Sequence, residues 1–344
     1  MIFLKSQQRW TKFAVLLSAL TILCGSCFQE KPKMETIDIF AMDTFMSVRA
    51  YTRDETVLTL VEGEILRLEG LFSVTKSGSD ICNINTNWAA KVDPNTLELV
   101  SSALGLCGRT DGALDLSVYP LVALWGFTTG ENRIPSTDKI NNKLQYVDYR
   151  NIQIGENIVN ILPGMQIDLG AVAKGYTGDR ICRILSDHGV ESAVVNLGGN
   201  VQTIGKRADG ALWRVGIKNP FDVENNLMVV EVENKAVVTS GNYERFFIGD
   251  DGKRYCHIID PKTGIPSDNG IVSMTIIGES GLLCDGLSTA LFVMGEEKAI
   301  KFWQNSDDFE MIFVTSDGRI GITEGISETC SNLSEFETTV ITRE

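Results

Sequence analysis

The chain has 344 residues, enough for one large domain or two ordinary ones. Its 45 acidic and 31 basic side chains give a formal net charge of −14 at pH 7. Because nucleic acids bind to basic surfaces, this charge argues against nucleic acid as a partner. It also means that an anionic ligand must be held by local groups or by a metal ion.

The first 26 residues are typical of a lipoprotein signal peptide. A basic segment precedes the apolar run Phe13–Leu23, which is too short to span a bilayer as a permanent helix. The run ends in Leu-Cys-Gly-Ser-Cys, which predicts cleavage before Cys27 and acylation of that cysteine. An ordinary secretory signal and an uncleaved anchor are the alternatives. We therefore expect a polar tether over residues 27–36 and a lipid-anchored protein of the bacterial cell envelope, facing the periplasm or the extracytoplasmic side.

Apart from Cys24 and Cys27, the cysteines are scattered without any CxxC pair, and the chain has only two histidines. A zinc site is therefore not expected. A secreted protein could oxidise some of these thiols. Buried thiols are favoured for Cys182, Cys256 and Cys284, because their neighbours in the sequence are apolar.

Helices and strands alternate through a single predicted domain over residues 37–334, followed by a polar tail over 335–344. Helical spacing of apolar residues predicts helices over 56–72, 96–109, 172–188, 282–294 and 297–306. Alternating or apolar runs between turn signals predict strands over 45–51, 193–197, 201–204, 213–218, 228–232, 236–239, 246–248, 254–259 and 272–277, and a last hairpin turning at 317–318. Because hairpins outnumber strand–helix–strand units, an α+β fold is favoured over a doubly wound sheet. No GxGxxG follows a strand, so a nicotinamide Rossmann site is disfavoured.

The segment DGLSTALFV begins with the first candidate for a metal site. Asp285 and Thr289 are four residues apart on a predicted helix, so they lie on one face. A carboxylate and a hydroxyl are hard oxygen ligands, which suit magnesium and leave positions for water and phosphate oxygens. The alternative is a helix start in which Asp285 lies near the cap and Thr289 has no role.

The segment DLGAVAKGY is a candidate for anion binding. Asp168 and Lys174 lie on either side of the small pair Gly170–Ala171 at the start of a predicted helix. Small residues let a ligand approach the backbone, and the amides of a helix N-terminus favour an anion. A capped helix with an exposed lysine is the alternative interpretation.

Two further segments carry candidate residues. Asn196–Asn200 (NLGGN) is either a hairpin turn or a place where a planar or phosphate group meets the backbone. His257 follows a predicted strand and precedes the Asp260–Pro261 turn, which makes it a candidate acid or base. His188, beside Gly189 at a helix end, is expected to be a surface cap.

In their order along the chain, these segments resemble the ApbE-type FAD:protein FMN transferases. The matching segments are AMDTFMSV (41–48), SGSDICNIN (77–85), DGALDLSVYPLVALWGF (111–127), IDLGAVAKGYTGD (167–179), VVNLGGNV (194–201), WRVGIKNP (213–220), VVTSGNYERFF (237–247), HIIDPKTGIP (257–266) and CDGLSTALFVMG (284–295). The resemblance covers nearly the whole chain after the tether, and its specificity comes from the order of many motifs.

The resemblance implies a fold and a reaction. The fold is α+β and related to the T-fold, with two intimately joined α/β halves that form one catalytic unit around an FAD cleft. The reaction is a magnesium-dependent transfer of FMN from FAD to a threonine or serine hydroxyl of a partner protein, which forms a phosphoester and releases AMP. Family acceptors carry a short motif of the type S/T-G-A-S/T, in membrane redox subunits or secreted flavoproteins. This chain has no such motif, so we do not expect it to flavinylate itself.

The resemblance also assigns residues. The metal ligands would be Asp285, Thr289 and the carbonyl of Ala171. The FAD contacts would be Met42, Thr75, Ala113, Leu114, Asp115, Asp168, Lys174, Asn196, Gly198, Gly199 and Ile259. His257 and Asp285 are the candidate catalytic residues, with His257 as the base that deprotonates the attacking hydroxyl. The alternative gives His257 a binding or structural role beside the Asp260–Pro261 turn, with the metal or Asp285 activating the hydroxyl.

One departure from the family pattern keeps two other functions open. Many relatives carry an aromatic residue where Thr75 stands, and often an arginine where Asn83 stands. A small polar residue at position 75 would leave room for a second metal or an attacking water, so hydrolysis of FAD to FMN and AMP is an alternative. A flavin-binding lipoprotein without catalysis is a third reading. Asp285, Thr289 and His257 argue against that reading, because storage of FAD needs no metal directed at the diphosphate.

Overall fold

The computed structural model describes residues 31–343, and the compact unit of interest begins at Met34. The predicted signal peptide and Cys27 lie outside the described residues. Within residues 31–343, no helix combines the length and the apolar character that crossing a bilayer requires.

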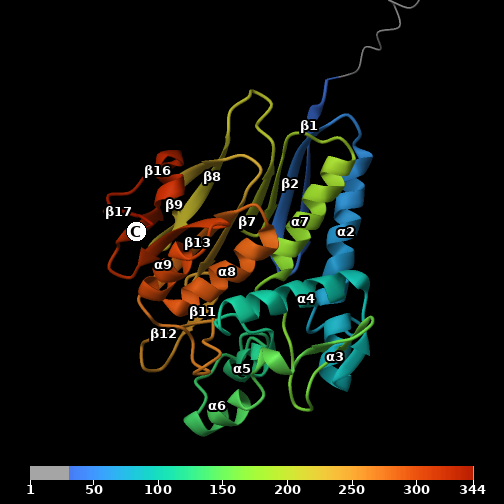
Figure 1. Ribbon diagram of the computed structural model, residues 1–344, viewed down its shortest axis with the longest axis vertical. Coiled ribbons are helices and arrows are strands. Elements are labelled where there is room, and N and C mark those ends of the chain that lie inside the picture. The colour runs from blue at the N-terminus through green and yellow to red at the C-terminus, as the bar shows by residue number, and fades with distance from the viewer. Residues whose placement is uncertain (1–30, 344) are drawn as a thin grey trace, which may run out of the picture. The chain divides into compact units, whose positions relative to one another are not determined.

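A nine-stranded sheet forms the framework (Figure 1). Its strands, in spatial order, are β1 (Lys33–Ala41), β2 (Thr44–Thr52), β6 (Ala193–Leu197), β7 (Asn200–Ile204), β10 (Ala236–Gly241), β13 (Ile271–Gly278), β14 (Phe309–Thr315), β15 (Ile320–Thr323) and β17 (Thr338–Ile341). The pairs from β2 to β15 are antiparallel, and β15 pairs with β17 in parallel. This arrangement confirms the predicted α+β class.

Both faces of the sheet are covered, and the side-chain alternation of β14 shows how. Phe309, Met311 and Phe313 pack into one apolar cluster, whereas Ile312 and Val314 pack into another on the opposite face. The first face carries α2 (Thr56–Phe72), α7 (Ala173–Asp187), α8 (Gly281–Met294) and α9 (Glu296–Gln304). The second carries a small sheet of β8 (Trp213–Asn219), β9 (Asp222–Val232) and β16 (Cys330–Asn332). Successive side chains of a strand point to opposite faces of the sheet. A sheet covered on both sides therefore needs apolar residues at odd and at even positions of its strands.

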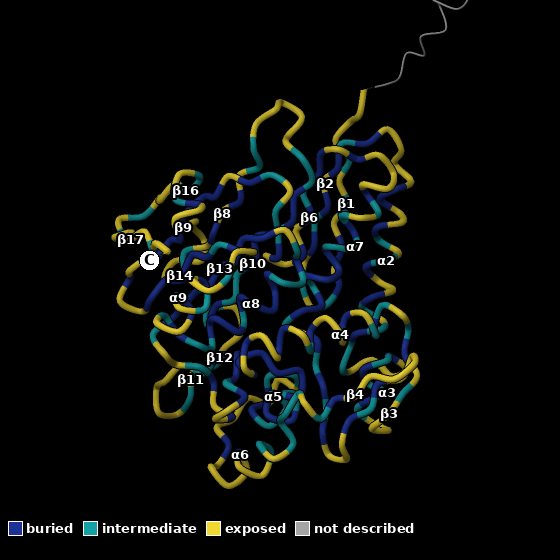
Figure 2. The backbone as a smooth tube through the Cα atoms, in the orientation of Figure 1, coloured by how far each residue is buried: buried dark blue, intermediate teal, exposed yellow. Residues whose placement is uncertain are grey.

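A second group of elements packs against the ends of α7 and α8. It contains α3 (Asp80–Asn87), α4 (Pro94–Arg109), α5 (Tyr119–Trp125) and α6 (Thr137–Leu144), the 3-10 turns Leu116–Val118 and Tyr149–Asn151, and a small sheet of β3 (Ala89–Lys91), β5 (Ile158–Asn160) and β4 (Gln153–Ile154). The two-stranded hairpin of β11 (Phe246–Ile248) and β12 (Arg254–Cys256) lies near α5 and α6 (Figure 1). Figure 2 colours much of α6 and of this hairpin as exposed, in contrast to the buried central strands.

Several predicted boundaries differ from the structure. The tether predicted over 27–36 is wrong in its second half, because β1 begins at Lys33 and lies at the edge of the main sheet. The tail predicted over 335–344 contains β17, whose residues Thr338–Ile341 align with Ile320–Thr323. Their sequences are polar because an edge strand keeps side chains in solvent, and local pattern alone does not reveal such strands.

The remaining helix and strand predictions agree closely with the structure. Helix 56–72 is confirmed residue for residue, and α8 and α9 each begin one residue earlier than expected. The strand predicted over 254–259 ends at Cys256, because the chain then turns through the segment that contains His257. His188 caps the end of α7, with its ring Nδ1 2.8 Å from the carbonyl of Ile184.

Candidate active site

Asp285 lies in the second turn of α8 and is 4% exposed. Its Oδ2 accepts a hydrogen bond of 2.8 Å from the N–H of Gly175 in α7. Burial raises the pKa of this carboxyl, while the charge of Lys174 and the Gly175 amide oppose that rise. A carboxylate this far from water needs a cationic partner to stay ionised.

The hydroxyl groups near Asp285 come from two elements. Ser240, in β10, lies 2.8 Å from the hydroxyl of Ser288 and 3.3 Å from that of Thr289. Thr289 therefore stands one turn after Asp285 with its oxygen inside a small polar cluster. The predicted common face of Asp285 and Thr289 follows from the continuous helix that carries both.

Asn200 shows that this polar region lacks partners within the protein. It is 2% exposed, and neither its side-chain oxygen nor its nitrogen has a hydrogen-bond partner within the described chain. Its amide lies close enough to Asp285 to lower the carboxyl's pKa, but it does not meet hydrogen-bond geometry. Buried polar atoms without a protein partner usually meet a ligand, an ion or water.

The side chains of Asp285 and Thr289 suit a hard divalent cation, since they are a carboxylate and a hydroxyl one turn apart on α8. Ala171 lies in the turn before α7, and its carbonyl stays a predicted ligand. Magnesium takes such oxygen ligands and keeps several positions for water and phosphate. Between residues 31 and 343, no three His, Cys, Asp or Glu side chains are grouped to hold a metal, so Asp285 would depend on hydroxyl and carbonyl oxygens.

Glycines allow α7 and α8 to approach each other closely enough to form this site. A Cβ at Gly175 would lie 2.2 Å from the carbonyl oxygen of Gly281 and 2.7 Å from Cβ of Asp285. A Cβ at Gly281 would meet the side chain of Gln202 at 1.7 Å. Gln202 in turn donates a 2.9 Å hydrogen bond to the carbonyl of Gly175. Any larger residue at positions 175 or 281 would separate the two helices.

Asp179 sets the register between the same helices. From the second turn of α7, its carboxylate accepts hydrogen bonds from the N–H of Gly281 (2.6 Å), the N–H of Leu282 (3.0 Å) and the hydroxyl of Ser280 (3.2 Å). It therefore satisfies amides at the start of α8 that have no partner within that helix. Burial raises the pKa of Asp179, and these hydrogen bonds oppose the rise. Sequence reasoning missed this residue, although it ends the IDLGAVAKGYTGD motif.

A group of charges surrounds the start of α7. Burial raises the pKa of Asp168, while the Gly170 N–H at 2.8 Å and the charges of Lys174 and Arg245 lower it. No carboxylate of the described residues lies within 4 Å of the Lys174 amine, so its charge is available to a ligand. Arg245 also pairs with Asp43 at 3.4 Å. Arg245 was not among the predicted site residues, although the segment VVTSGNYERFF contains it.

His257 is half-buried directly after β12. Its ring Nδ1 lies 3.2 Å from the carbonyl of Arg245, a geometry that assigns the proton to Nδ1 and leaves the lone pair on Nε2. The pKa of His257 is lowered to about 4, mainly by burial and also by the charges of Arg245 and Lys174, while the hydrogen bond to the Arg245 carbonyl opposes the shift. The imidazole is therefore neutral at pH 7, with Nε2 unprotonated.

Three of the predicted flavin contacts lie at turns with open backbone. Met42 has a φ of 48°, and its N–H donates to Glu69 at 3.0 Å. Asn196 accepts from the N–H of Gly199 at 2.9 Å, and a Cβ at Gly199 would meet nothing within 4 Å. Gly198, by contrast, has Thr44 2.3 Å from its Cβ position, so it serves close packing of the hairpin.

Other predicted contacts have evident structural roles. Both carboxylate oxygens of Asp115 are used internally: Oδ1 by the N–H and hydroxyl of Ser117, and Oδ2 by the N–H of Tyr149. Ala113 and Leu114 are buried in the apolar cluster beneath α4. Ile259 is buried with the side chains of α5 and α6. For these four residues, only the backbone or the edge of the side chain is left to meet a ligand.

Thr75 lies in an exposed turn after α2. Its hydroxyl is 3.2 Å from that of Ser73, and its N–H donates to the same oxygen. Asn83 donates to the carbonyl of Gly78 at 3.3 Å. Both residues use their polar groups to hold the local turn.

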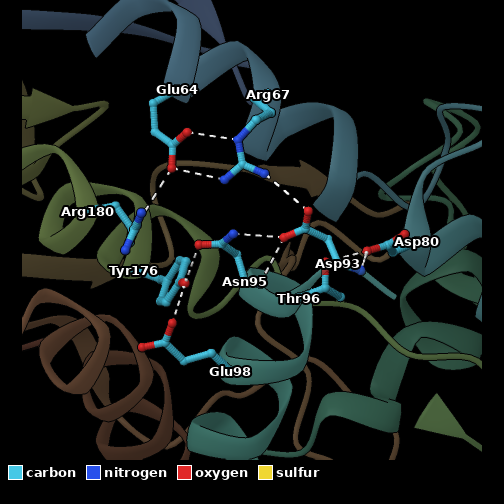
Figure 3. A network of polar contacts seen from close by, with 9 residues as sticks. All are labelled: Glu64, Arg67, Asp80, Asp93, Asn95, Thr96, Glu98, Tyr176 and Arg180. Carbon is cyan, nitrogen blue, oxygen red and sulfur yellow. Dashed lines mark hydrogen bonds and ion pairs between the residues drawn. The ribbon is translucent and has the colours of Figure 1, made fainter. Parts of the chain in front are cut away.

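A polar network behind the site fixes α7 against α2 and α4 (Figure 3). The Tyr176 hydroxyl, two residues after Lys174, lies 2.9 Å from Glu98 and 3.1 Å from Asn95. Burial and Glu98 raise the pKa of Tyr176, so the hydroxyl stays protonated. The network continues through Asp93, Asp80, Thr96, Arg67, Glu64 and Arg180. Fixed hydrogen-bond partners on neighbouring helices keep α7, and with it Lys174, in one position.

The sequence and the fold match known proteins closely. The model of the ApbE family matches residues 42–313. A curated FAD:protein FMN transferase of Klebsiella pneumoniae is 35% identical over 277 residues, covering 78% of this chain and 85% of the relative. One of Vibrio cholerae is 33% identical over 318 residues, covering 88% and 94%.

Solved structures agree. The crystal structure of the ApbE protein of Thermotoga maritima has a TM-score of 0.81 at 33% identity, covering 86% of this chain and 99% of that one. The apo flavinyl transferase ApbE of Pseudomonas stutzeri has a TM-score of 0.79 at 29% identity, covering 88% and 98%. This chain is an α+β protein with a buried oxygen-rich site between two helices. It belongs to the ApbE family.

Proposed function

We propose that this chain transfers FMN from FAD to a threonine or serine hydroxyl of a partner protein. The observation that carries the proposal is the buried Asp285, with Thr289 one turn along α8 and Lys174 near enough to lower its pKa. Two curated relatives, matched over 85% and 94% of their length, are named FAD:protein FMN transferases.

The chain's own residues divide the work. Lys174 offsets the charge of the FAD diphosphate, and the open backbone around Gly170–Ala171 lets the phosphates approach the start of α7. His257 Nε2 accepts the proton of the acceptor hydroxyl, whose oxygen forms a bond to the phosphorus of the FMN half. The bond from that phosphorus to the bridging oxygen breaks, and AMP leaves with this oxygen. The product is a phosphoester between FMN and the acceptor.

Magnesium would be held by Asp285, Thr289 and the Ala171 carbonyl. A divalent cation at that position stabilises negative charge on transferring phosphoryl oxygens. Asn200 and Ser240 lie beside these ligands and would orient them through hydrogen bonds.

The test is a product analysis. Purified protein is incubated with FAD and magnesium, with and without an acceptor domain that carries the S/T-G-A-S/T motif. The proposal expects FMN covalently linked to the acceptor, with one AMP formed for each FMN attached. FAD that stays intact in the presence of magnesium and acceptor would contradict it and favour a flavin-binding protein.

FAD hydrolysis is the second candidate, favoured by the exposed, small Thr75. An aromatic side chain there would cover the flavin and exclude water, whereas threonine leaves space for water to attack the same phosphorus. Free FMN formed without acceptor measures this activity. Thr75→Tyr is expected to lower the free FMN and preserve the linked FMN. An unchanged ratio of the two products would remove Thr75 from the argument.

We also propose a location for the enzyme and its acceptor. Acylation of Cys27 would hold the enzyme at the bacterial envelope, where membrane redox subunits or secreted flavoproteins are accessible. Stable anchoring needs more than one acyl chain.

A further inference from the structure

Two elements flank His257 in the sequence and lead from the site to one surface. The β11–β12 hairpin ends directly before His257, whose N–H donates to the carbonyl of Arg245 at 3.0 Å. The turn after His257 lies against α6, because a Cβ at Gly264 would be 2.6 Å from the side chain of Ile140. Trp125 in α5 donates to the carbonyl of Gly264 at 2.9 Å. The hairpin, α5 and α6 are thus all tied to the segment that holds His257.

The hairpin has one packed face and one open face. Phe247 and Tyr255 are opposite each other, with ring centroids 5.3 Å apart, and they pack into the apolar cluster of α5. Phe246 and Ile248 are 40% and 57% exposed. The guanidinium of Arg254 lies 4.3 Å from the ring centre of Phe246, so a cation of the chain itself already covers part of this open face.

A groove of about 650 Å³ runs beside α6 and reaches the tip of the hairpin on its packed side. Leu124 and Ile134 provide apolar surface in the groove, and Ile134 is 45% exposed. A Cβ at Gly249, at the hairpin tip, would lie 2.8 Å from both Cδ1 of Ile134 and the ring of Tyr255, so the groove meets the hairpin on the face of Phe247 and Tyr255. We call the surface formed by Leu124, Ile134, Lys139 and Lys143 the hairpin–α6 surface.

The charge of the groove is opposite to that of the chain. Arg133, Lys139 and Lys143 line it, with Asp138 as the one acidic residue of the lining. Neither Lys139 nor Lys143 has a carboxylate within 4 Å in the part of the chain that the structure describes. In a protein with a net charge of −14, two unpaired lysines beside exposed apolar side chains favour an acidic, partly apolar partner.

We propose that the hairpin–α6 surface docks the acceptor protein, through a segment that places apolar side chains against Leu124 and Ile134 and acidic ones against Lys139 and Lys143. The inference rests on the proposed function, since a transferase must hold a second protein beside its nucleotide. Three strand residues span about 10 Å. A segment bound along the hairpin therefore reaches from the groove to His257, where its hydroxyl loses a proton.

The test uses two fluorescent peptides and the full chain loaded with FAD and magnesium. Both peptides contain Ser-Gly-Ala-Thr; one is flanked by leucines and aspartates, the other by leucines and lysines. Lys139→Glu with Lys143→Glu reverses the charge of the groove, and Ile134→Ser removes exposed apolar surface from it. The matched control is Lys298→Glu with Lys301→Glu, which reverses a second basic groove of about 410 Å³ beside α9.

Fluorescence anisotropy gives the affinity of each peptide. We expect the acidic peptide to bind the parent protein more tightly than the basic one does. The groove reversal should weaken binding of the acidic peptide about tenfold and Ile134→Ser severalfold, and the control should leave it unchanged. Equal affinity of the acidic peptide for parent, groove reversal and control would overturn the proposal.

A membrane is the other macromolecule that this surface could meet. If the groove reversal abolishes binding to vesicles of anionic phospholipid and leaves binding of the acidic peptide intact, the surface contacts lipid and the proposal is wrong. FAD affinity and magnesium-dependent formation of free FMN, measured on each variant, test the nucleotide site separately. Loss of docking with intact FAD binding therefore differs from failure of the proposed function, in which no variant cleaves or transfers FAD.

Discussion

Removal of the Asp179 carboxylate is expected to destabilise the fold and to loosen the metal site. Its three hydrogen bonds hold the first turn of α8 against α7. Loss of an N-cap costs about 1 kcal/mol, and hydrogen bonds to a charged group contribute about 1.5–3 kcal/mol. Part of this is offset, because the buried carboxylate is itself desolvated, as its raised pKa indicates. We expect Asp179→Ala to lower the free energy of unfolding by about 2–4 kcal/mol.

The assay is denaturant unfolding combined with magnesium titration of FMN transfer. Asp179→Asn keeps one acceptor oxygen and is expected to cost about half as much. Both variants should need more magnesium for half-maximal transfer, because α8 carries Asp285 and Thr289 as one rigid helix. Asp187→Ala, at an exposed position near the end of α7, is the control. An Asp179→Ala protein with the stability and magnesium requirement of that control would refute the reasoning.

Three further substitutions test Lys174, His257 and Cys27, and a pH profile tests the protonation of His257. Lys174→Ala should weaken FAD binding by about 1–3 kcal/mol, because the lysine amine is a solvated point charge whose loss costs little more than that. An unchanged dissociation constant for FAD would exclude a role of Lys174 in binding the diphosphate. His257→Asn should keep FAD and magnesium but lose transfer by about 10²–10⁴-fold across neutral pH, whereas turnover within a few-fold of the parent would make the histidine structural. Because burial lowers the pKa of His257 to about 4, the parent's transfer rate should show no loss from protonation of His257 between pH 8 and 6 and should fall as the pH approaches 4. Cys27→Ser should release the protein into the soluble extracytoplasmic fraction, and continued acyl labelling of that variant would show that another residue is modified.

The pH dependence of stability has a definite sign at His257. Its folded pKa of about 4 lies below the unfolded value near 6.5, so the unfolded chain binds more protons between these pH values. The contribution of this group to stability is fully present above pH 6.5 and is lost as the pH falls towards 4. His257→Asn should therefore flatten the stability curve over that interval.

Sequence patterns predicted those parts of the structure that depend on local spacing. The four-residue interval between Asp285 and Thr289 put both on one helix face, and the Gly198–Gly199 pair predicted the turn between β6 and β7. Helix 56–72 was found in full, because its apolar residues repeat with helical periodicity over 17 residues.

Features that depend on distant contacts could not be predicted in this way. Asp179 and Gly281 are 102 residues apart, and Ser240 meets Thr289 across 49 residues. The local sequence does not predict that β10 lies between β7 and β13. This position in the sheet brings Ser240 to α8. The polar strand β17 is stable because β15 supplies its hydrogen bonds, so its own residues carry no signal.

The most direct test of the account is FMN transfer by Asp285→Ala over a range of magnesium concentrations, with Asp285→Asn as the variant that preserves volume. The account predicts that removal of the anionic ligand lowers transfer on the order of 10²-fold or more, with FAD still bound through Lys174. Near-normal turnover of either variant at low magnesium would contradict it.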